Sequence, residues 1–216
     1  MEEPKMLKHL SVLTAAIFLT GTSSVFAAST TDLTVTGIIT PAACTPGLAN
    51  NGNIDYGKIA AKDLNQTQTT FLGRTPLQVN VECDAATRFA LHLVDNRASS
   101  TLFPGAMYGL GMTNSSEKLG AFDLSYSDAV TENGATSMVA SVDQGTTWDR
   151  HDEGDGTPPT MWTAAGDKST GSWLPVATKN LTMNMNVGAF IARADSLTLT
   201  DEVSIDGSAT LEVKYL

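Results

Sequence analysis

Histidine, cysteine and basic residues are scarce in this 216-residue chain, and each scarcity excludes a class of function. Only two cysteines and three histidines are present, and thirteen Lys and Arg residues face twenty-three Asp and Glu residues, for a formal net charge of −10. Nucleic acid and anionic lipid surfaces require a basic face on their partner. We therefore expect neither nucleic acid nor a membrane surface as a partner.

The sequence also lacks the motifs of hydrolases and nucleotide-binding enzymes. There is no G-x-S-x-G and no H-E-x-x-H, and "GLGMTN" fails the G-x-G-x-x-G pattern at its last position. His92 alternates with Ala90 and Val94, which is more typical of a strand residue than of a catalytic base. We expect no enzymatic activity and no cofactor.

The N-terminus has the pattern of a secretory signal. Lys5 and Lys8 precede a short apolar stretch, "HLSVLTAAIFLTG", and Val25 and Ala27 supply the small residues of a cleavage site. The stretch is shorter than the roughly 20 residues that span a bilayer. We expect residues 1–27 to be cleaved, leaving one domain over residues 28–216. An apolar N-terminal strand is the alternative interpretation, and a start at Met6 would improve the basic region.

Export determines how the two cysteines are interpreted. An even number of cysteines in an oxidising compartment is typical of a disulfide, here between Cys44 and Cys83. Closing a loop of this length stabilises a fold by about 4 kcal/mol in the chain-entropy model. Metal binding by the pair would require nearby histidines, and none lies close in the sequence.

Strand patterns dominate the rest of the chain. Apolar residues alternate with polar ones, most clearly where Leu181, Met183 and Met185 are separated by Thr182 and Asn184. No segment after the signal sustains a helical period. Many short strands separated by turn residues favour an antiparallel β-sandwich. The segments expected as strands are "DLTVTGIIT", "TPLQVNVEC", "RFALHLVD", "AFDLSYS", "NLTMNMNVGAFIA", "SLTLTDEVSI" and "ATLEVKYL".

Residues 143–173 depart from this pattern and are expected to form a long polar loop. The loop holds the three tryptophans, Trp148, Trp162 and Trp173. Indole rings can stack on sugar rings, so together they could form a ligand platform. The alternative is that they turn inward and anchor the loop.

The same stretch carries an acidic run around His151. Asp149, Asp152, Glu153 and Asp155 do not match the spacing of a calcium loop, and one histidine with carboxylates is a poor zinc site. We expect a solvated loop and no bound metal.

Four motifs resemble one family. "TGIITPAAC", "IDYGKI", "TPLQVNVEC" and the terminal "DGSATLEVKYL" with its penultimate tyrosine are similar to subunits of bacterial chaperone–usher fimbriae. "YGLGMTNSSEKLGAFDLSYSDA" and "SVDQGTTW" resemble a less characterised group of secreted fimbrial-like proteins.

The resemblance implies an immunoglobulin-like sandwich without its final strand and a groove beside the C-terminal strand. A periplasmic chaperone fills such a groove during export through the usher, and the N-terminal arm of another subunit then replaces it. The chaperone also holds the terminal carboxylate. The residues implied for the edge are Ala209, Leu211, Val213, Tyr215 and Leu216, and those for the arm are Leu33 and Val35.

Two functions follow as expectations. The first is a structural or adhesive fimbrial subunit, exported to the periplasm and then placed on the cell surface or secreted, with a host or surface glycan as a conceivable ligand. Because only "ASTTD" separates the cleavage site from "LTVTGIIT", a tip subunit, a minor subunit and a non-assembling relative all remain open. The second is a secreted or periplasmic module that binds a carbohydrate or peptide without polymerising.

Overall fold

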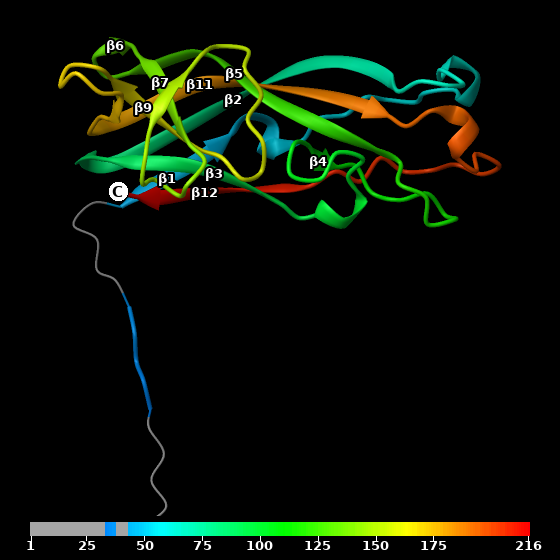
Figure 1. Ribbon diagram of the computed structural model, residues 1–216, viewed down its shortest axis with the longest axis horizontal. Coiled ribbons are helices and arrows are strands. Elements are labelled where there is room, and N and C mark those ends of the chain that lie inside the picture. Colours follow the sequence, from blue (N-terminus) through cyan, green and yellow to red (C-terminus); the bar gives the residue numbers. More distant parts are fainter. Residues whose placement is uncertain (1–32, 38–42) are drawn as a thin grey trace, which may run out of the picture. The chain divides into compact units, whose positions relative to one another are not determined.

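A computed structural model describes residues 33–37 and 43–216, and two antiparallel sheets make up the second range (Figure 1). The first sheet, sheet A, has the order β1–β2–β11–β5–β4, with β6 paired to β5. Its strands are β1 (Cys44–Leu48), β2 (Thr70–Thr87), β11 (Thr178–Ile191), β5 (Gly120–Thr131), β4 (Tyr108–Gly109) and β6 (Gly134–Ala135).

The second sheet, sheet B, has the order β12–β3–β9–β7–β8, with β10 paired to β9. Its strands are β12 (Ala209–Tyr215), β3 (Phe89–Asp95), β9 (Trp162–Asp167), β7 (Ser137–Ser141), β8 (Asp149–His151) and β10 (Leu174–Pro175). The only helical turns in the described ranges are short 3₁₀ turns, η1 (Ala49–Gly52), η2 (Ala61–Asp63), η3 (Ala98–Ser100) and η4 (Ala194–Ser196). The prediction of an all-β sandwich is confirmed.

The core lies between the two sheets, and period-2 alternation builds it. In β11 the side chains of Leu181, Met183, Met185 and Val187 are buried, while the intervening polar residues are partly exposed. β2 and β3 contribute in the same way through Val79, Val81, Leu91 and Leu93. The predicted disulfide is confirmed: Cys44 and Cys83 are register partners in β1 and β2, and their sulfurs are bonded.

Three local predictions are wrong. Residues 33–37 form no strand, and "SLTLTDEVSI" follows η4 without a strand of its own. Residues 143–173 are not one long loop, because they supply β8 and β9 to sheet B. The predicted signal peptide lies outside the described residues. No helix in the described ranges is long and apolar enough to cross a membrane.

Candidate functional site: an apolar groove beside the C-terminal strand

The C-terminal strand β12 lies at the edge of sheet B. It pairs with β3 from Ala209 opposite Asp95 to Tyr215 opposite Phe89, and no other strand of the described ranges pairs with it. β1 is in turn an edge strand of sheet A, paired only with β2 in the described residues. A free strand edge exposes unpaired N–H and C=O groups, and β12 is such an edge in the described residues.

An open groove runs past this edge and reaches the core. One hollow, of about 310 Å³, is bordered by Ile54 and Tyr56 on one bank and by Ala209 and Leu211 on the other. A second hollow, of about 500 Å³, shares Ile54, Tyr56 and Ile205 with the first. The apolar residues that line the two hollows from the core are Leu64, Leu77, Leu93, Leu110, Leu119, Phe122, Leu124, Met185, Val187 and Ile191.

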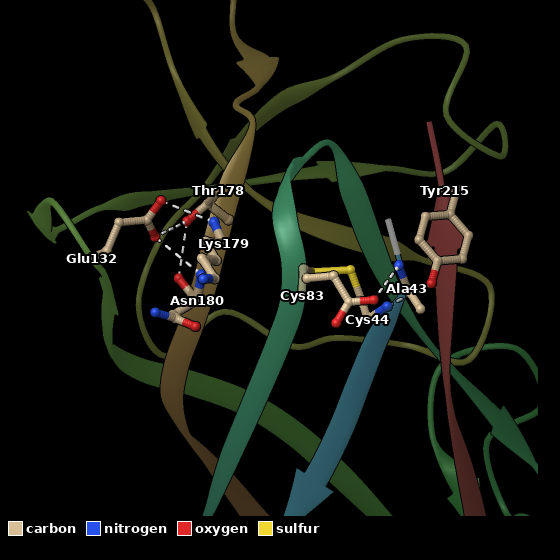
Figure 2. Close-up of a disulfide and its surroundings, with 9 residues drawn as sticks. Ala43, Cys44, Cys83, Glu132, Thr178, Lys179, Asn180 and Tyr215 are labelled. Atoms are coloured by element: carbon tan, nitrogen blue, oxygen red, sulfur yellow. Dashed lines mark hydrogen bonds between the residues drawn. A yellow bond between two sulfur atoms is a disulfide. The ribbon is translucent and has the colours of Figure 1, made fainter. Parts of the chain in front are cut away.

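The two edge strands are joined at one end of β12. The phenolic oxygen of Tyr215 accepts a hydrogen bond of 2.8 Å from the backbone N–H of Cys44, which also carries the disulfide (Figure 2). Ala43 N–H lies 3.4 Å from a carboxylate oxygen of Asp84. Sheet A and sheet B are therefore linked here through β1 and β12.

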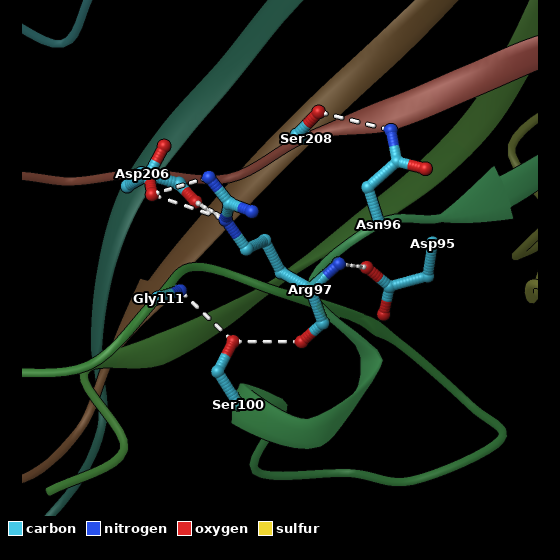
Figure 3. Close-up of polar contacts among 7 residues, drawn as sticks. All are labelled: Asp95, Asn96, Arg97, Ser100, Gly111, Asp206 and Ser208. Atoms are coloured by element: carbon cyan, nitrogen blue, oxygen red, sulfur yellow. Dashed lines mark hydrogen bonds and ion pairs between the residues drawn. The ribbon is translucent and has the colours of Figure 1, made fainter. Parts of the chain in front are cut away.

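The bank that leads into β12 is fixed by polar contacts to the turn after β3 (Figure 3). Arg97 donates from Nε and Nη2 to one carboxylate oxygen of Asp206, at 3.0 and 2.7 Å. Asn96 donates from Nδ2 to the hydroxyl of Ser208 at 3.0 Å, and its backbone N–H donates to the Ser208 carbonyl. Residues 206–208 are thus ordered although they belong to no strand.

The opposite bank is held mainly by Tyr56. Its hydroxyl donates to the carbonyl of Val187 at 2.9 Å. Burial is the largest cause of the raised pKa of this phenol, and the charge of Asp123 adds to it. Lys58 and Glu202, which both line the larger hollow, lie 3.6 Å apart but are highly exposed. An exposed pair of this kind stabilises little, so it leaves the groove easy to open.

The structure places the predicted edge residues at different points along β12. Ala209 and Leu211 line the groove, and Val213 packs against the main core. Tyr215 makes the contact with Cys44. Leu216 lies beside Gly145, where an added side chain would also meet Trp148 and Trp162.

The predicted arm residues are highly exposed. The side chains of Leu33 and Val35 are 89% and 86% exposed, respectively. Large apolar side chains left in solvent at alternate positions are available for burial against a partner.

The three tryptophans share one location, on the outer face of sheet B. They are half-buried and pack against a small cluster of Ala90, Val139 and Ala164. Trp148 donates its indole N–H to the Gly145 carbonyl at 3.1 Å. Cations approach the other two rings, Lys214 at 5.9 Å from Trp162 and Arg150 at 5.8 Å from Trp173. The three indoles thus cover a second, smaller cluster.

The acidic run does not gather around a common point. Arg150 pairs with Asp152 at 2.7 Å, and Glu153 accepts the backbone N–H of Asp128 at 2.9 Å. His151 instead points inward, buried against Tyr126 and hydrogen-bonded to Thr157. Within the described ranges no three His, Cys, Asp or Glu side chains are grouped so as to hold a metal ion.

Sequence reasoning missed the residues on the two banks of the groove. Ile54 and Tyr56 stand in "IDYGKI", a motif that was noted for its resemblance but not assigned to a lining. Ile205 directly precedes "DGSATLEVKYL" and Gly207 lies within it, and both line the smaller hollow. The alternation of Ile54 and Tyr56 with Asp55 was the available signal, because it indicates a short segment with one apolar side.

The fold and site together define a disulfide-linked antiparallel β-sandwich with an accessible edge strand and an apolar groove beside it. Residues 33–106 match the family described as "Protein of unknown function (DUF1120)". The matched stretch includes the arm residues, both cysteines and the first bank of the groove.

Two proteins of Escherichia coli strain K12 are similar along most of the chain. Protein GltF is 26% identical over 249 residues, which covers 95% of this chain and 98% of the relative. Uncharacterized protein YhcF is 23% identical over 206 residues, which covers 81% of this chain and 86% of the relative. The similarity thus extends beyond the groove to the whole sandwich.

Proposed function

We propose that the chain is a structural or adhesive fimbrial-type subunit, without catalytic activity, that accepts a donated β-strand along β12. One observation carries the proposal: the free edge of β12 borders a groove lined by side chains of the main core. An inserted strand would complete an otherwise incomplete immunoglobulin-like sandwich. The resemblance of the terminal motif to chaperone–usher subunits supports the same function.

A β-strand fits this site better than a compact ligand does. The edge offers backbone hydrogen-bond groups along Ala209–Tyr215, and the groove offers apolar surface on one side only. A donated strand uses both, since its backbone extends the sheet while alternate side chains enter the groove. Each large apolar side chain that is buried contributes roughly 1.5–3 kcal/mol.

The occupant we propose in the assembled state is the N-terminal arm of another subunit of this type. In this chain the arm includes Leu33 and Val35, which alternate with Thr34 and Thr36 and are highly exposed. The first strand of the described residues is β1, which begins at Cys44, and residues 33–37 belong to neither sheet. These exposed apolar side chains support the proposal that the segment is an arm that reaches a partner.

The proposal includes the route to that state. A periplasmic chaperone would occupy the groove during export, and the usher would exchange it for the arm at the cell surface. The disulfide is compatible with an oxidising compartment such as the periplasm. The chain would then reside in a surface fimbrium as a major, minor or tip subunit.

A peptide-binding experiment tests this function. A synthetic peptide of residues 28–40 is added to the exported chain lacking its own residues 28–40, and binding is followed by fluorescence anisotropy. The control peptide carries Ser at Leu33, Val35 and Ile39, which keeps its length and removes the large apolar side chains at these alternate positions. Binding of the first peptide alone supports strand acceptance. Equal binding of both peptides, or of neither, contradicts it and favours a secreted module that does not polymerise.

A further inference from the structure

A third hollow, of about 450 Å³, is lined by residues 131–137, 166–168 and 173–178 and shares no lining residue with the groove. The β5–β6 hairpin of sheet A borders it on one side, and the β9–β10 hairpin of sheet B borders it on the other. Its volume is within the range of about 300–1,000 Å³ that is typical of small-ligand sites. We refer to this hollow as the hairpin cleft.

The lining of the hairpin cleft is amphipathic. Trp173 and Val176 supply apolar surface, and Asn133, Thr136, Asp167 and Lys168 supply polar groups. Sugars have the matching character, since their rings have apolar C–H faces and a rim of hydroxyl groups that donate and accept hydrogen bonds. An indole ring packs against the apolar face, and amide, carboxylate and ammonium groups bind the hydroxyls.

Several polar groups of the cleft have no partner among the described residues. Asp167 uses one carboxylate oxygen, Oδ1, to accept from the backbone and hydroxyl of Ser169, and its Oδ2 makes no hydrogen bond there. No hydrogen bond or ion pair within the described ranges involves the side-chain amide of Asn133 or the ammonium of Lys168. These groups supply acceptors and donors for vicinal hydroxyls at no cost in internal contacts.

Hydrogen bonds to the Glu132 carboxylate connect one wall of the cleft to β11. Glu132, at the tip of the β5–β6 hairpin, accepts from the Thr178 hydroxyl at 2.5 Å and from the backbone N–H groups of Lys179 and Asn180 at 2.9 and 3.1 Å (Figure 2). Thr178 also lines the cleft, and its side chain is buried. The hairpin is therefore fixed to the start of β11, and a preorganised wall lowers the entropy lost on binding.

We propose that the hairpin cleft binds a neutral saccharide, with Asn133, Asp167 and Lys168 as hydroxyl-binding groups. Trp173, which also packs against the outer cluster and has Arg150 over its ring, supplies apolar surface where it lines the cleft. A peptide strand is the poorer occupant, because β7 and β10 already pair with β9 beside the cleft. Anionic sugars are disfavoured by the formal net charge of −10 and by the carboxylate of Asp167 beside Lys168. This inference is independent of strand acceptance at β12.

Saturation-transfer NMR on the complete exported chain tests the assignment. The probes are the methyl glycosides of mannose, galactose and N-acetylglucosamine at millimolar concentration, with the anionic methyl glycoside of N-acetylneuraminic acid for comparison. We expect at least one neutral glycoside to bind. Trp173→Ala and Asp167→Asn should each weaken it about tenfold, which corresponds to about 1.4 kcal/mol. Trp148→Phe, outside the cleft, is the matched control and should bind normally.

Trp173→Ala could disturb the fold, because Trp173 packs against the outer cluster. Asp167→Asn should not, because Asp167 is exposed, so this variant keeps the test valid if Trp173→Ala misfolds. The inference is overturned if none of the neutral glycosides binds, if only the anionic one binds, or if binding is unchanged in both cleft variants. Because the peptide assay at β12 uses a different surface, either result there leaves this test unaffected.

Discussion

The hydroxyl of Tyr215 and the backbone N–H of Cys44 are joined by a hydrogen bond of 2.8 Å across 171 positions of sequence. This bond connects the C-terminal strand of sheet B with the first strand of sheet A, next to the disulfide. A donated strand that runs along the whole of β12 would therefore meet this link at the Tyr215 end of the strand.

Replacing Tyr215 with Phe tests this link. The variant keeps the ring and removes the bond, and we expect it to lower the free energy of unfolding by about 0.5–1.5 kcal/mol, the usual net contribution of one hydrogen bond. Urea denaturation measures the change, and peptide binding at β12 should fall little because Leu211 is untouched. A free energy of unfolding equal to that of the wild type would show that water replaces the bond without loss.

The disulfide prediction concerns stability. Cys44 and Cys83 are 39 residues apart, and their bond fixes β1 to β2. Changing both to Ser should lower the free energy of unfolding by about 4 kcal/mol in the chain-entropy model. Denaturation of the oxidised chain and of the double variant measures this. A change below about 1 kcal/mol would mean that the reduced unfolded chain is already compact.

We expect the Glu132 carboxylate to contribute to the free energy of unfolding in a way that is lost in acid. The Glu132 carboxylate accepts hydrogen bonds from the Thr178 hydroxyl and from two backbone N–H groups. These bonds lower the pKa of the carboxyl to about 2, from an ordinary value of 4.5. Its contribution to stability is therefore complete above pH 4.5 and is lost as the pH falls from 4.5 toward 2. Because the carboxylate is accessible to solvent, Glu132→Gln should cost only about 1 kcal/mol at pH 7.

The dependence of stability on pH is the control for the role of Glu132. The difference in stability between wild type and Glu132→Gln should be constant above pH 5 and should shrink below pH 4. Lys179→Ala is the matched variant, since it changes a neighbouring charge and keeps the backbone N–H that Glu132 accepts. A difference that does not vary with pH would contradict the assigned role of the charge.

His151 should act in a separate pH window. Burial lowers the pKa of this imidazole below 6.5, although the charges of Asp155 and Asp152 oppose the shift. The unfolded chain then binds a proton at a higher pH than the folded chain does. Stability from neutral His151 is complete above pH 6.5 and declines as the pH falls through the window below it, by at most about 1.4 kcal/mol per pH unit.

Comparison with His151→Gln isolates this contribution, because Gln can still bond to Thr157 and does not titrate in that window. Urea denaturation between pH 7.5 and 5 should show a smaller decline for the variant than for the wild type. The carboxylates with lowered pKa values, such as Glu132, lose their contribution only below about pH 4.5 and do not confuse the result. If the free energy of unfolding declines equally in the wild type and in the variant, protonation of His151 does not destabilise the folded protein, and the prediction is wrong.

Much of the sandwich was predictable, because alternation marks strands that have one buried face. The Met183 and Met185 pattern identified β11, and "ATLEVKYL" identified β12. β9 was missed since its buried residues, Ala164, Ala165 and Gly166, are small and carry little hydrophobic pattern. The prediction of a strand at "SLTLTDEVSI" was wrong, because local alternation does not reveal whether a strand pairs with the segment, and none of the described strands does.

The candidate site was predictable only on the side of β12. The strand itself showed a pattern, whereas the groove is a space between segments far apart in the sequence, such as Ile54 and Ile205. The shared position of the tryptophans was likewise not predictable from the sequence. Their sequence proximity indicated one loop, but their shared position depends on Ala90 and Val139, which come from other strands.

The last prediction concerns the groove face of β12. Leu211 lines the groove and Val213 packs against the core, so Leu211→Ser with Val213→Ser removes two apolar contacts, each worth roughly 1.5–3 kcal/mol when fully buried. Binding of the arm peptide should fall by at least tenfold through the loss of the Leu211 contact alone, since 1.4 kcal/mol corresponds to a factor of ten. Fluorescence anisotropy measures the loss, and circular dichroism checks the fold.

The matched control is Thr210→Ser, which lies between the two positions and faces away from the groove. Thr210 accepts from the amide of Asn96 at 3.0 Å through its hydroxyl, which Ser retains. Glu212 is a poorer control, because its carboxylate contacts both His92 and Lys214 and its pKa is lowered chiefly by the bond from Lys214. If the double variant remains folded and binds the peptide as tightly as Thr210→Ser does, β12 does not accept a strand, and the proposed function fails at this step.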